Sequence, residues 1–331
     1  GADMMLQTSK GIVAVSKSNN EINEEDVSRA LEASRSLATP LNYEILHVLP
    51  KKYIVDNQMN IKDPVGMTGM RLEVDSNIIL GSASQIKNLT KAVYRTGLEI
   101  DDLVLSVLAC GESVLTKRQK ELGTVVVDFG NSTTNLAIFE EGELLHAAVL
   151  PFGSENITND LAIGLRVSVE IAEEVKNRFG DCRTNVVNRA EMVNLLEAGA
   201  SETEQVKQKY INEIIQARME EILQKVDGEL KKAQRSCMLP AGAVFTGGGA
   251  KLPGLVEVAK KVLCLPASLG YPLNINSISD KAADLGFASA IGLVRWGSMM
   301  EINDQGGGIN IFKGVSKATG QLKKWLKALV P

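Results

Sequence analysis

The chain has 331 residues, of which 44% are hydrophobic and 23% charged, and its formal net charge is −4. These values are typical of a soluble globular protein with two or more subdomains, and they exclude a disordered chain. The mild acidity, without a basic stripe interleaved with aromatic residues, argues against nucleic-acid binding. No apolar run is long enough to span a bilayer, and the four scattered cysteines are expected to be reduced, mostly buried thiols.

The first hundred residues predict a small α/β unit. Asn23 can cap a helix that runs to Leu37, because the acidic residues after it lie against the positive end of the helix dipole. Runs of alternating apolar residues then indicate strands, and a second helix follows. The strands are expected at residues 44–50, 52–56 and 70–74, and the second helix at residues 84–96.

The rest of the chain alternates strands with helices. Residues 123–151 predict three strands, with Glu141-Gly142 as the turn of a hairpin. A long helix at residues 204–234 carries an apolar stripe at helical spacing. Strand meanders joined by crossover helices predict an α/β architecture. Further helices are expected at residues 101–116, 155–165, 169–178, 255–263 and 284–296, the last of them rich in small residues that suit close packing.

Two glycine-rich turns follow short apolar strands. The first is Asp128-Phe-Gly-Asn-Ser-Thr-Thr134, and the second is Thr246-Gly-Gly-Gly249, just before a predicted helix. Glycine lets backbone N–H groups approach an anion, and hydroxyl residues add donors. Either turn alone is more often ordinary turn chemistry, but the pair in this order suggests a nucleotide held from two sides. The chain has neither a Walker P-loop nor a Gly-x-Gly-x-x-Gly that opens a helix after a strand.

Both turns resemble motifs of the actin-like ATPases, namely the second phosphate motif and the adenosine motif. Within that superfamily, the stretches Glu44–Pro50, Ile61–Met67 and Val149–Gly153 resemble the FtsA family of bacterial cell-division proteins. The resemblance covers nearly the whole chain. It implies an α/β, actin-like (ribonuclease-H-like) ATPase fold that carries the small inserted subdomain of the FtsA family.

The resemblance also implies a site for ATP and Mg. Asp128 would position the metal ion through water, and the first turn would donate hydrogen bonds to phosphates. Adenosine would lie against the second turn, with Glu173 and Lys176 holding ribose and base; outside the family, these two residues would be read as a solvated ion pair on one helix face. The expected cofactor-binding residues are Asp128, Gly130, Asn131, Ser132, Thr133, Thr134, Glu173, Lys176, Gly247, Gly248 and Gly249.

The first turn departs from the family pattern, which puts efficient hydrolysis in doubt. Asn131 and Ser132 stand where two glycines are common, and Asn135 stands where Asp is usual. We therefore expect ATP binding with at most weak ATPase activity. The superfamily's first phosphate motif does not occur before Asn20, so we expect an N-terminally truncated fold in which residues 1–16 are a strand pair from the first large subdomain.

The domain boundaries expected from the resemblance divide the chain into eight parts. They are residues 1–18 as a remnant of the first large subdomain, 19–97 as the small inserted subdomain, 98–121 as a helix of the first large subdomain, 122–182 with 240–283 as the second large subdomain, 183–239 as a subdomain that binds FtsZ, 284–300 as a return helix, 301–319 as a linker and 320–331 as an amphipathic membrane-targeting helix.

The partners implied by the resemblance are the C-terminal peptide of FtsZ, further copies of the chain in protofilaments, and a membrane surface. Arg218 lies in an Ala-Arg-Met-Glu-Glu-Ile-Leu stretch that resembles the FtsZ-contacting helix of the family, although a plain role on the helix surface is open as well.

The segment 320–331 has the pattern of a short cationic helix with apolar residues on one face. Such a helix is typical of an interfacial membrane anchor, and the FtsA family ends in one. A terminal helix docked on the body is the alternative. The expected membrane contacts are Leu322, Lys323, Lys324, Trp325, Leu326, Lys327 and Leu329.

The function implied is that of a cell-division protein that binds ATP, polymerises and anchors FtsZ to the cytoplasmic face of the bacterial cell membrane at the division site. Two alternatives share the superfamily fold: a pilus-assembly scaffold and, less favoured, a sugar or acetate kinase. A kinase would require a motif for a second substrate, which we do not find, and would not need a membrane-binding tail.

Overall fold

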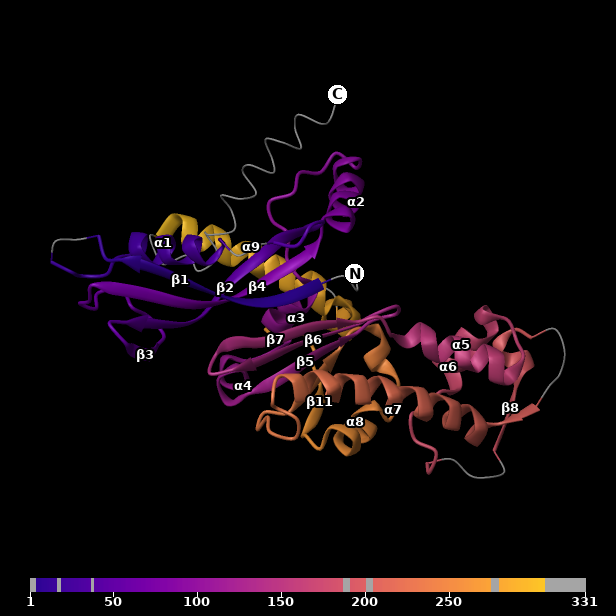
Figure 1. Cartoon of the computed structure of the whole chain (residues 1–331). Helices are drawn as coiled ribbons and strands as arrows, with labels where there is room; N and C mark the ends of the chain where they lie inside the picture. Colours follow the sequence, from indigo (N-terminus) through magenta and orange to yellow (C-terminus); the bar gives the residue numbers. More distant parts are fainter. Residues whose placement is uncertain are drawn as a thin grey trace. The chain divides into compact units, whose positions relative to one another are not determined.

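The computed structural model describes residues 4–16, 19–36, 39–186, 191–200, 205–274 and 280–306 (Figure 1). The chain divides into two compact units. The first unit comprises residues 3–105 together with those from 294 onward, and the second comprises residues 106–293. Each unit has a β-sheet and an apolar core of its own.

The first unit is built on a four-stranded antiparallel sheet with the order β1-β4-β2-β3. Helix α1 (Glu24–Ser34) packs on β1 and β4, and the core lies between them. Helix α2 (Ala83–Tyr94) follows β4 without a break. The strands are β1 (Met4–Ala14), β2 (Tyr43–Val55), β3 (Gln58–Ile61) and β4 (Arg71–Ser82).

The beginning of the chain differs from its expected assignment. We expected a strand pair of the first large subdomain, whereas the structure has the single strand β1, which pairs with β4 over 11 residues. Gly11 explains how α1 lies close to this strand, because a Cβ there would be 1.9 Å from the Ala30 carbonyl oxygen. In the structure, β1 therefore belongs to the same sheet and core as the small inserted subdomain.

Strand β2 replaces the two separate strands expected at residues 44–50 and 52–56. Its register against β4 shifts twice, between Ile45 and His47 and between Pro50 and Lys52. Proline lacks the N–H that a regular ladder needs, and a bulge tolerates that loss. The apparent break in the pattern is thus a bulge within one long strand.

Asn23 caps α1 as predicted. Its side-chain oxygen accepts from the Asp26 N–H at 2.9 Å, and the Asp26 carboxylate accepts from the Asn23 N–H at 3.2 Å. This reciprocal capping box satisfies two backbone donors that the helix leaves open. The helix ends at Ser34 and not at the expected Leu37.

His47 lies fully buried on β2 of the first unit. Its Nε2 accepts a hydrogen bond from the Leu105 N–H at 3.0 Å, and its ring lies edge-on to Trp296 at 5.8 Å. Its Nδ1 has no partner within the described part of the chain. Burial lowers the pKa of His47 to about 4, so the imidazole is neutral at physiological pH.

The second unit is built on a five-stranded sheet with the order β11-β10-β5-β6-β7. β5, β6 and β7 form the predicted antiparallel meander, β10 pairs with β5 in parallel, and β11 pairs with β10 in parallel. Glu141 and Gly142 form the hairpin turn as predicted, both with positive φ. The strands are β5 (Thr124–Phe129), β6 (Thr134–Glu140), β7 (Glu143–Leu150), β10 (Ala243–Thr246) and β11 (Ala267–Leu269).

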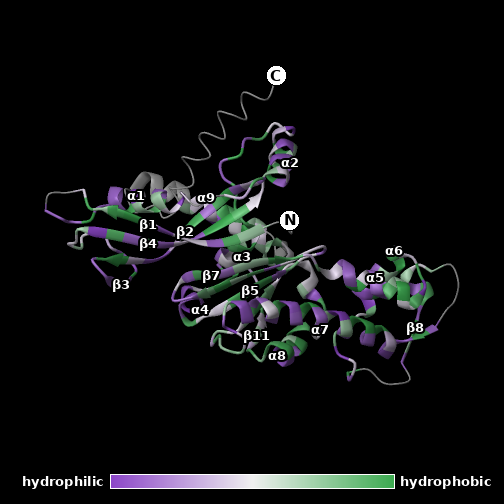
Figure 2. Cartoon of the chain, viewed as in Figure 1, coloured by the Kyte–Doolittle hydropathy of each residue, from purple (hydrophilic) through white to green (hydrophobic). Residues whose placement is uncertain are grey.

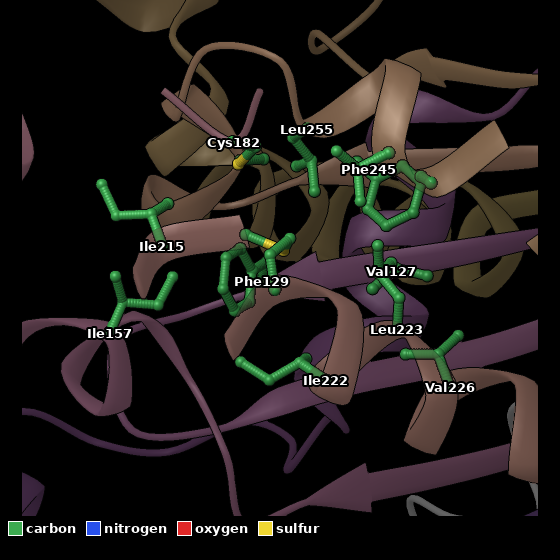
Figure 3. Packing of buried hydrophobic residues seen from close by; sticks show 14 of the residues in the cluster. Val127, Phe129, Ile157, Cys182, Ile215, Ile222, Leu223, Val226, Phe245 and Leu255 are labelled. Atoms are coloured by element: carbon green, nitrogen blue, oxygen red, sulfur yellow. The ribbon is translucent and has the colours of Figure 1, made fainter. Parts of the chain in front are cut away.

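Helices pack on this sheet and on one another and enclose a large apolar core, in which Phe129 lies centrally (Figure 3). Cys110 and Cys182 are buried, whereas Cys237 and Cys264 are exposed, which differs from the mostly buried thiols that we expected. Figure 2 shows both hydrophilic and hydrophobic segments along α7. The helices are α3 (Ser106–Val114), α4 (Lys117–Leu122), α5 (Ser154–Leu165), α6 (Val169–Phe179), α7 (Gln208–Lys232) and α8 (Leu255–Leu263).

Helix α9 (Ala288–Gly306) begins in the second unit and continues into residues of the first. Gly292 lets it pack directly on α3, since a Cβ would lie 1.8 Å from the Ala109 carbonyl oxygen. The close packing expected from its small residues is thus present. The helix also extends beyond residue 300, where we expected a linker to begin.

Helices α5 and α6 pack on one another and on α7. The short strands β8 (Met192–Asn194) and β9 (Gln205–Lys207) pair with each other between α6 and α7. We expected a subdomain boundary near Arg183. In the structure, the elements on both sides of that position share one core.

Candidate functional site

The two glycine-rich turns meet at one edge of the second unit's sheet. β5 and β10 are parallel neighbours, and Thr246 lies opposite Asp128 in their register. Because parallel strands end at the same edge, the turns that follow them lie side by side. The approach is close: a Cβ on Gly247, whose φ is +89°, would lie 2.6 Å from the Phe129 carbonyl oxygen.

A pocket of about 490 Å³ lies beside these turns. The space beside Gly248 is open, because a Cβ on this residue would meet no atom within 4 Å. Gly249 rests on the Phe129 ring, from which a Cβ would be 2.7 Å away. The pocket is lined by Asn131, Ser154, Glu173, Lys176, Asn177, Gly248, Gly249, Lys251, Leu252 and Pro253.

Five of the residues that the sequence predicted as cofactor contacts therefore line one pocket. They are Asn131, Glu173, Lys176, Gly248 and Gly249. The pocket also has lining residues that were not predicted from the sequence, namely Ser154, Asn177, Lys251, Leu252 and Pro253. The last three come two to four residues after Gly249 of the second glycine turn, and Ser154 directly follows Gly153.

The first turn presents unused backbone donors. The Gly130 N–H donates to the Thr133 carbonyl oxygen at 3.0 Å and closes the turn. The N–H groups of Asn131, Ser132 and Thr133 donate to no acceptor in the described ranges. Successive free N–H groups in a turn form a concave site for an anion.

A carboxylate lies against this turn. Glu155, in the first turn of α5, accepts a hydrogen bond from the Ser132 hydroxyl at 3.0 Å and lies 3.5 Å from the Asn131 amide nitrogen. Gly153 makes the approach possible, since a Cβ there would lie 2.1 Å from the Asn131 carbonyl oxygen. Glu155 was not predicted as a site residue, because its contact with Ser132 joins two separate elements of the fold.

Thr134 is placed differently from its expected role. Its side chain is buried, and its hydroxyl donates to the Phe152 carbonyl oxygen at 2.7 Å. Its backbone belongs to β6. The side chain of Thr134 therefore holds the loop after β7 and is not a free donor to a phosphate.

Asp128 is not among the residues that line the pocket. Its Oδ2 accepts from the Asn135 amide at 3.2 Å, so the Asn that replaces the family's usual Asp acts as a donor here. Burial raises the pKa of Asp128, and the hydrogen bonds from Asn135 and the Cys110 thiol offset only part of that effect.

Glu173 and Lys176 differ sharply in exposure. The Lys176 side chain is 5% exposed, and its ammonium donates to Glu173 Oε2 at 2.6 Å, to Thr158 Oγ1 at 2.8 Å and to the Ser154 carbonyl oxygen at 3.4 Å. All three donors of the lysine are thus used within the protein. The Glu173 side chain is 44% exposed, and its carboxylate is the group that remains accessible.

The charge of this carboxylate is fixed by its neighbours. Burial alone raises the pKa of Glu173, but hydrogen bonds from Lys176 and Thr158 outweigh it and lower the pKa overall. Glu173 is therefore an ionised acceptor, suited to receive hydrogen bonds from hydroxyl groups. Lys251 adds a positive charge at the rim, where it pairs with Asp284 at 2.7 Å.

Arg218 lies on α7, away from this pocket, and holds two carboxylates. It forms a two-point contact with Asp160 of α5, with 2.9 Å between Nη2 and Oδ1, and it contacts Glu221 at 2.6 Å. The hydrogen bond with Asp160 raises the pKa of Arg218. Tyr210 of α7 also contacts α5, because its hydroxyl donates to the Gly164 carbonyl oxygen at 3.4 Å. Tyr210 and Ile163, which precedes Gly164 in the sequence, are both exposed.

The predicted membrane contacts, from Leu322 to Leu329, lie outside the described residues. Within the described ranges, none of the helices has both the length and the apolar character needed to cross a membrane. In those same ranges, no three potential His, Cys, Asp or Glu ligands come together around a metal position.

Solved structures with a similar fold define the class of protein. A chain of the PilM–PilN type IV pilus biogenesis complex matches with a TM-score of 0.60 and 18% identity, over 89% of this chain and 76% of that one. MreB5 of Spiroplasma citri, bound to ADP, matches with a TM-score of 0.53 and 15% identity, over 68% and 67%. The chain has an actin-like fold.

Sequence comparisons identify the family within this class. The model of the cell division protein FtsA matches residues 125–292, and the model of the SHS2 domain inserted in FtsA matches residues 1–80. FtsA of Pseudomonas aeruginosa is 32% identical over 96% of this chain and 77% of its own length. FtsA of Escherichia coli K12 is 32% identical over 99% and 78%, and that of Bacillus subtilis is 41% identical over 78% and 58%. The chain belongs to the FtsA family of cell division proteins.

Proposed function

We propose that the chain binds ATP in the pocket of the second unit and serves in cell division as a self-associating anchor that links FtsZ to the membrane. The observation that carries the nucleotide proposal is the meeting of the two glycine-rich turns on neighbouring strands, where Asp128 lies opposite Thr246. Two turns separated by more than a hundred residues contribute to one pocket, which favours a shared ligand over two unrelated turns.

The pocket offers a complementary group for each part of the nucleotide. The free N–H groups of residues 131–133 suit the phosphates. The open space beside Gly248 suits adenosine, and the accessible Glu173 carboxylate suits the ribose hydroxyls. Lys176 then acts by holding Glu173 in place, because its own donors are already used.

Magnesium would accompany the phosphates. Asp128 is outside the pocket lining and accepts a hydrogen bond from Asn135, so its carboxylate would hold a metal-bound water more readily than the ion itself. The ion would supply positive charge against the phosphates. Nucleotide-bound relatives of the fold support the proposal, since MreB5 of Spiroplasma citri is known bound to ADP and to AMPPNP.

The seam between α5 and α7 is the proposed docking place for the C-terminal peptide of FtsZ. It combines the Arg218 guanidinium with exposed apolar side chains at Ile163 and Tyr210. A short peptide that becomes ordered on binding gains affinity from apolar contacts together with a charged anchor. Because Arg218 pairs with Asp160, its role could also be purely structural. A charge swap between the two residues can distinguish this role from peptide binding.

Membrane attachment is proposed for residues 320–331, and polymerisation for the whole chain, as the family resemblance implies. Both place the protein at the cytoplasmic face of the membrane at the division site. The alternative is a pilus-assembly scaffold, which the fold similarity to a chain of the PilM–PilN complex suggests. At 18% identity, however, that similarity shows the fold alone. Family membership favours the division role.

Ligand-observed NMR with ATP tests the nucleotide proposal, because saturation transfer detects weak as well as tight binding. We expect ATP to bind and Gly248→Val to lower the affinity at least about tenfold by filling the space beside adenosine. Gly228→Val is the matched control: Gly228 also has open space for a Cβ and a backbone outside the left-handed region, but it lies on α7.

The control variant should bind ATP as the parent does. Equal binding by Gly248→Val and the parent would mean that the second glycine turn does not contact the nucleotide. No ATP signal from the parent chain would overturn the proposed nucleotide site as a whole.

A further inference from the structure

The two lysines that line the pocket, Lys176 and Lys251, differ in what their ammonium groups contact. Lys176 is buried, and acceptors of the protein use all three of its donors. The Lys251 side chain is 53% exposed, and its ammonium lies 2.7 Å from Asp284 Oδ2. In the part of the chain that the structure describes, Asp284 is its one partner. Lys251 is therefore the lining lysine that still has donors for an anionic ligand.

Asp284 is held in place by contacts that do not involve the lysine. Its Oδ1 accepts from the Gly286 N–H at 2.8 Å, and its carbonyl oxygen accepts from the Phe287 N–H at 3.1 Å. The hydrogen bonds from Lys251 and from the Gly286 N–H lower the pKa of Asp284, so the carboxylate is ionised at neutral pH. Asp284 itself is not among the residues that line the pocket. Its carboxylate is thus a fixed negative charge next to a lining residue.

The stretch that carries Asp284 is also bonded to the second glycine turn through the backbone. The Leu285 carbonyl oxygen accepts from the Gly247 N–H at 3.1 Å and from the Thr246 hydroxyl at 3.2 Å. Because these bonds do not involve Lys251, the stretch stays attached to the turn when the ion pair opens. The lysine can therefore exchange Asp284 for another partner without a rearrangement of the chain.

The ion pair is weak enough for a polyphosphate to displace it. Exposed ion pairs contribute little to stability, because water screens the charges and ordering two side chains costs entropy. ATP carries several negative charges on its phosphates, which together outweigh the single charge of one carboxylate. The flexible stem of a lysine lets its ammonium turn, whereas Asp284 is held by its own hydrogen bonds. The ammonium of Lys251 is thus the group that moves.

We propose that Lys251 binds the phosphates of ATP and that Asp284 competes with them for its ammonium. This role rests on the nucleotide site proposed above, and it adds a residue after the second glycine turn to those that hold the phosphates. Asp284 then acts as an internal competitor that lowers the affinity for polyphosphates but not for uncharged nucleosides. Binding of ATP opens the pair of Lys251 with Asp284, and release of ATP closes it.

The test compares the binding of ATP and adenosine to Asp284→Asn. The amide keeps an acceptor for the Gly286 N–H but has no charge to hold Lys251. Titrations followed by ligand-observed NMR at physiological salt should show about two- to fivefold tighter binding of ATP and unchanged binding of adenosine. Glu213→Gln is the matched control, because it breaks an exposed pair with Lys209 on α7, outside the pocket lining. It should leave the binding of both ligands unchanged.

A double-variant cycle shows whether the gain depends on Lys251. Lys251→Met removes the charge and keeps an unbranched side chain, so it should lower the affinity for ATP at least about threefold and leave that for adenosine unchanged. Adding Asp284→Asn to Lys251→Met should then change the affinity for ATP less than about twofold, because no ammonium is left to compete for.

Unchanged ATP binding by Asp284→Asn would overturn the competition, and weaker binding would mean that Asp284 holds Lys251 in place for the ligand. An equal gain for adenosine, or the same gain for ATP without the lysine, would show that the effect does not depend on Lys251. These results require that the parent chain binds ATP, whereas a parent without any ATP signal would refute the nucleotide site itself. Each substituted side chain is at least 36% exposed, and an unchanged circular dichroism spectrum would show that the variants are folded.

Discussion

The Ser132 hydroxyl donates a hydrogen bond to the Glu155 carboxylate, with 3.0 Å between the two oxygens. The same carboxylate lies 3.5 Å from the Asn131 amide nitrogen, at the turn where we place the phosphates. A phosphate that enters this turn therefore meets the negative charge of Glu155, which already accepts from the side-chain donors of Ser132 and Asn131. Like charges at such distances repel, so the carboxylate should oppose binding of a polyphosphate.

Glu155→Gln should therefore strengthen ATP binding. The amide keeps the size of the side chain but removes its charge, and we expect the affinity for ATP without divalent cations to rise about two- to tenfold. The affinity for adenosine, which carries no phosphate, should not change. An equal gain for both ligands, or a loss for ATP, would show that Glu155 is not near the phosphates.

Glu173→Gln should weaken binding through the ribose. An ionised acceptor that loses its charge gives up a strong hydrogen bond to a hydroxyl, so we expect about a tenfold loss of affinity for ATP. The comparison ligand is 2′,3′-dideoxy-ATP, which lacks the hydroxyls and should bind parent and variant alike. A similar loss for both nucleotides would point to general damage from leaving the buried Lys176 without its partner.

A charge swap should separate the two roles of Arg218. Arg218→Glu places two carboxylates against each other at Asp160, so weaker binding of the FtsZ peptide by that variant alone is ambiguous. The double variant Asp160→Arg, Arg218→Glu restores the pair in reverse. We expect it to have a higher Tm than Arg218→Glu, with part of the loss remaining because a carboxylate at position 218 repels Glu221. It should still bind the peptide at least about tenfold more weakly than the parent in fluorescence anisotropy. Restored peptide binding would assign Arg218 a structural role only.

Membrane binding should depend on the apolar face proposed for residues 320–331. Trp325→Glu places a charge among the apolar residues and should release the protein from anionic vesicles in a co-sedimentation assay. Thr319→Glu adds the same charge just before that segment and should leave binding nearly intact. Binding should be weak for single chains and firmer for assembled ones, because many tails then act together. Equal pelleting of both variants would exclude the anchor.

His47 should make the stability of the first unit depend on pH. Its pKa is about 4 in the folded chain and 6.5 in its ordinary state, so the unfolded chain takes up the proton first as the pH falls. Stability attributable to this group is intact above pH 6.5 and declines toward pH 4, by about 3 kcal/mol in all. His47→Gln keeps an acceptor for the Leu105 N–H, and urea unfolding should show a shallower decline for it over this range. Parallel profiles would mean that His47 does not titrate there.

Local patterns predicted the local structure well. The cap at Asn23 and the hairpin turn at Glu141-Gly142 depend on residues that are neighbours in sequence, and both are present as expected. The pairing of β1 with β4 and the close approach of Ala30 in α1 to Gly11 instead join separate elements, and no local pattern reveals such contacts. The same distinction between local patterns and long-range contacts applies to the candidate site. The glycine turns were visible in the sequence, but the contact of Glu155 with Ser132 and the use of the Thr134 hydroxyl by Phe152 required the fold.

The parallel pairing of β5 with β10 also bears on how the chain folds as it is made. At the start of these strands the Thr124 hydroxyl donates a hydrogen bond to the Gly242 carbonyl oxygen, and the two residues are separated by 118 positions in the sequence. The meander of β5, β6 and β7 can form from nearby contacts as soon as it is synthesised, whereas β10 arrives much later. Until then one edge of β5, a strand in which four of the six residues are apolar, is unpaired. Between the synthesis of Phe129 and that of Thr246, the nascent protein therefore has an open strand edge at which misassembly can begin.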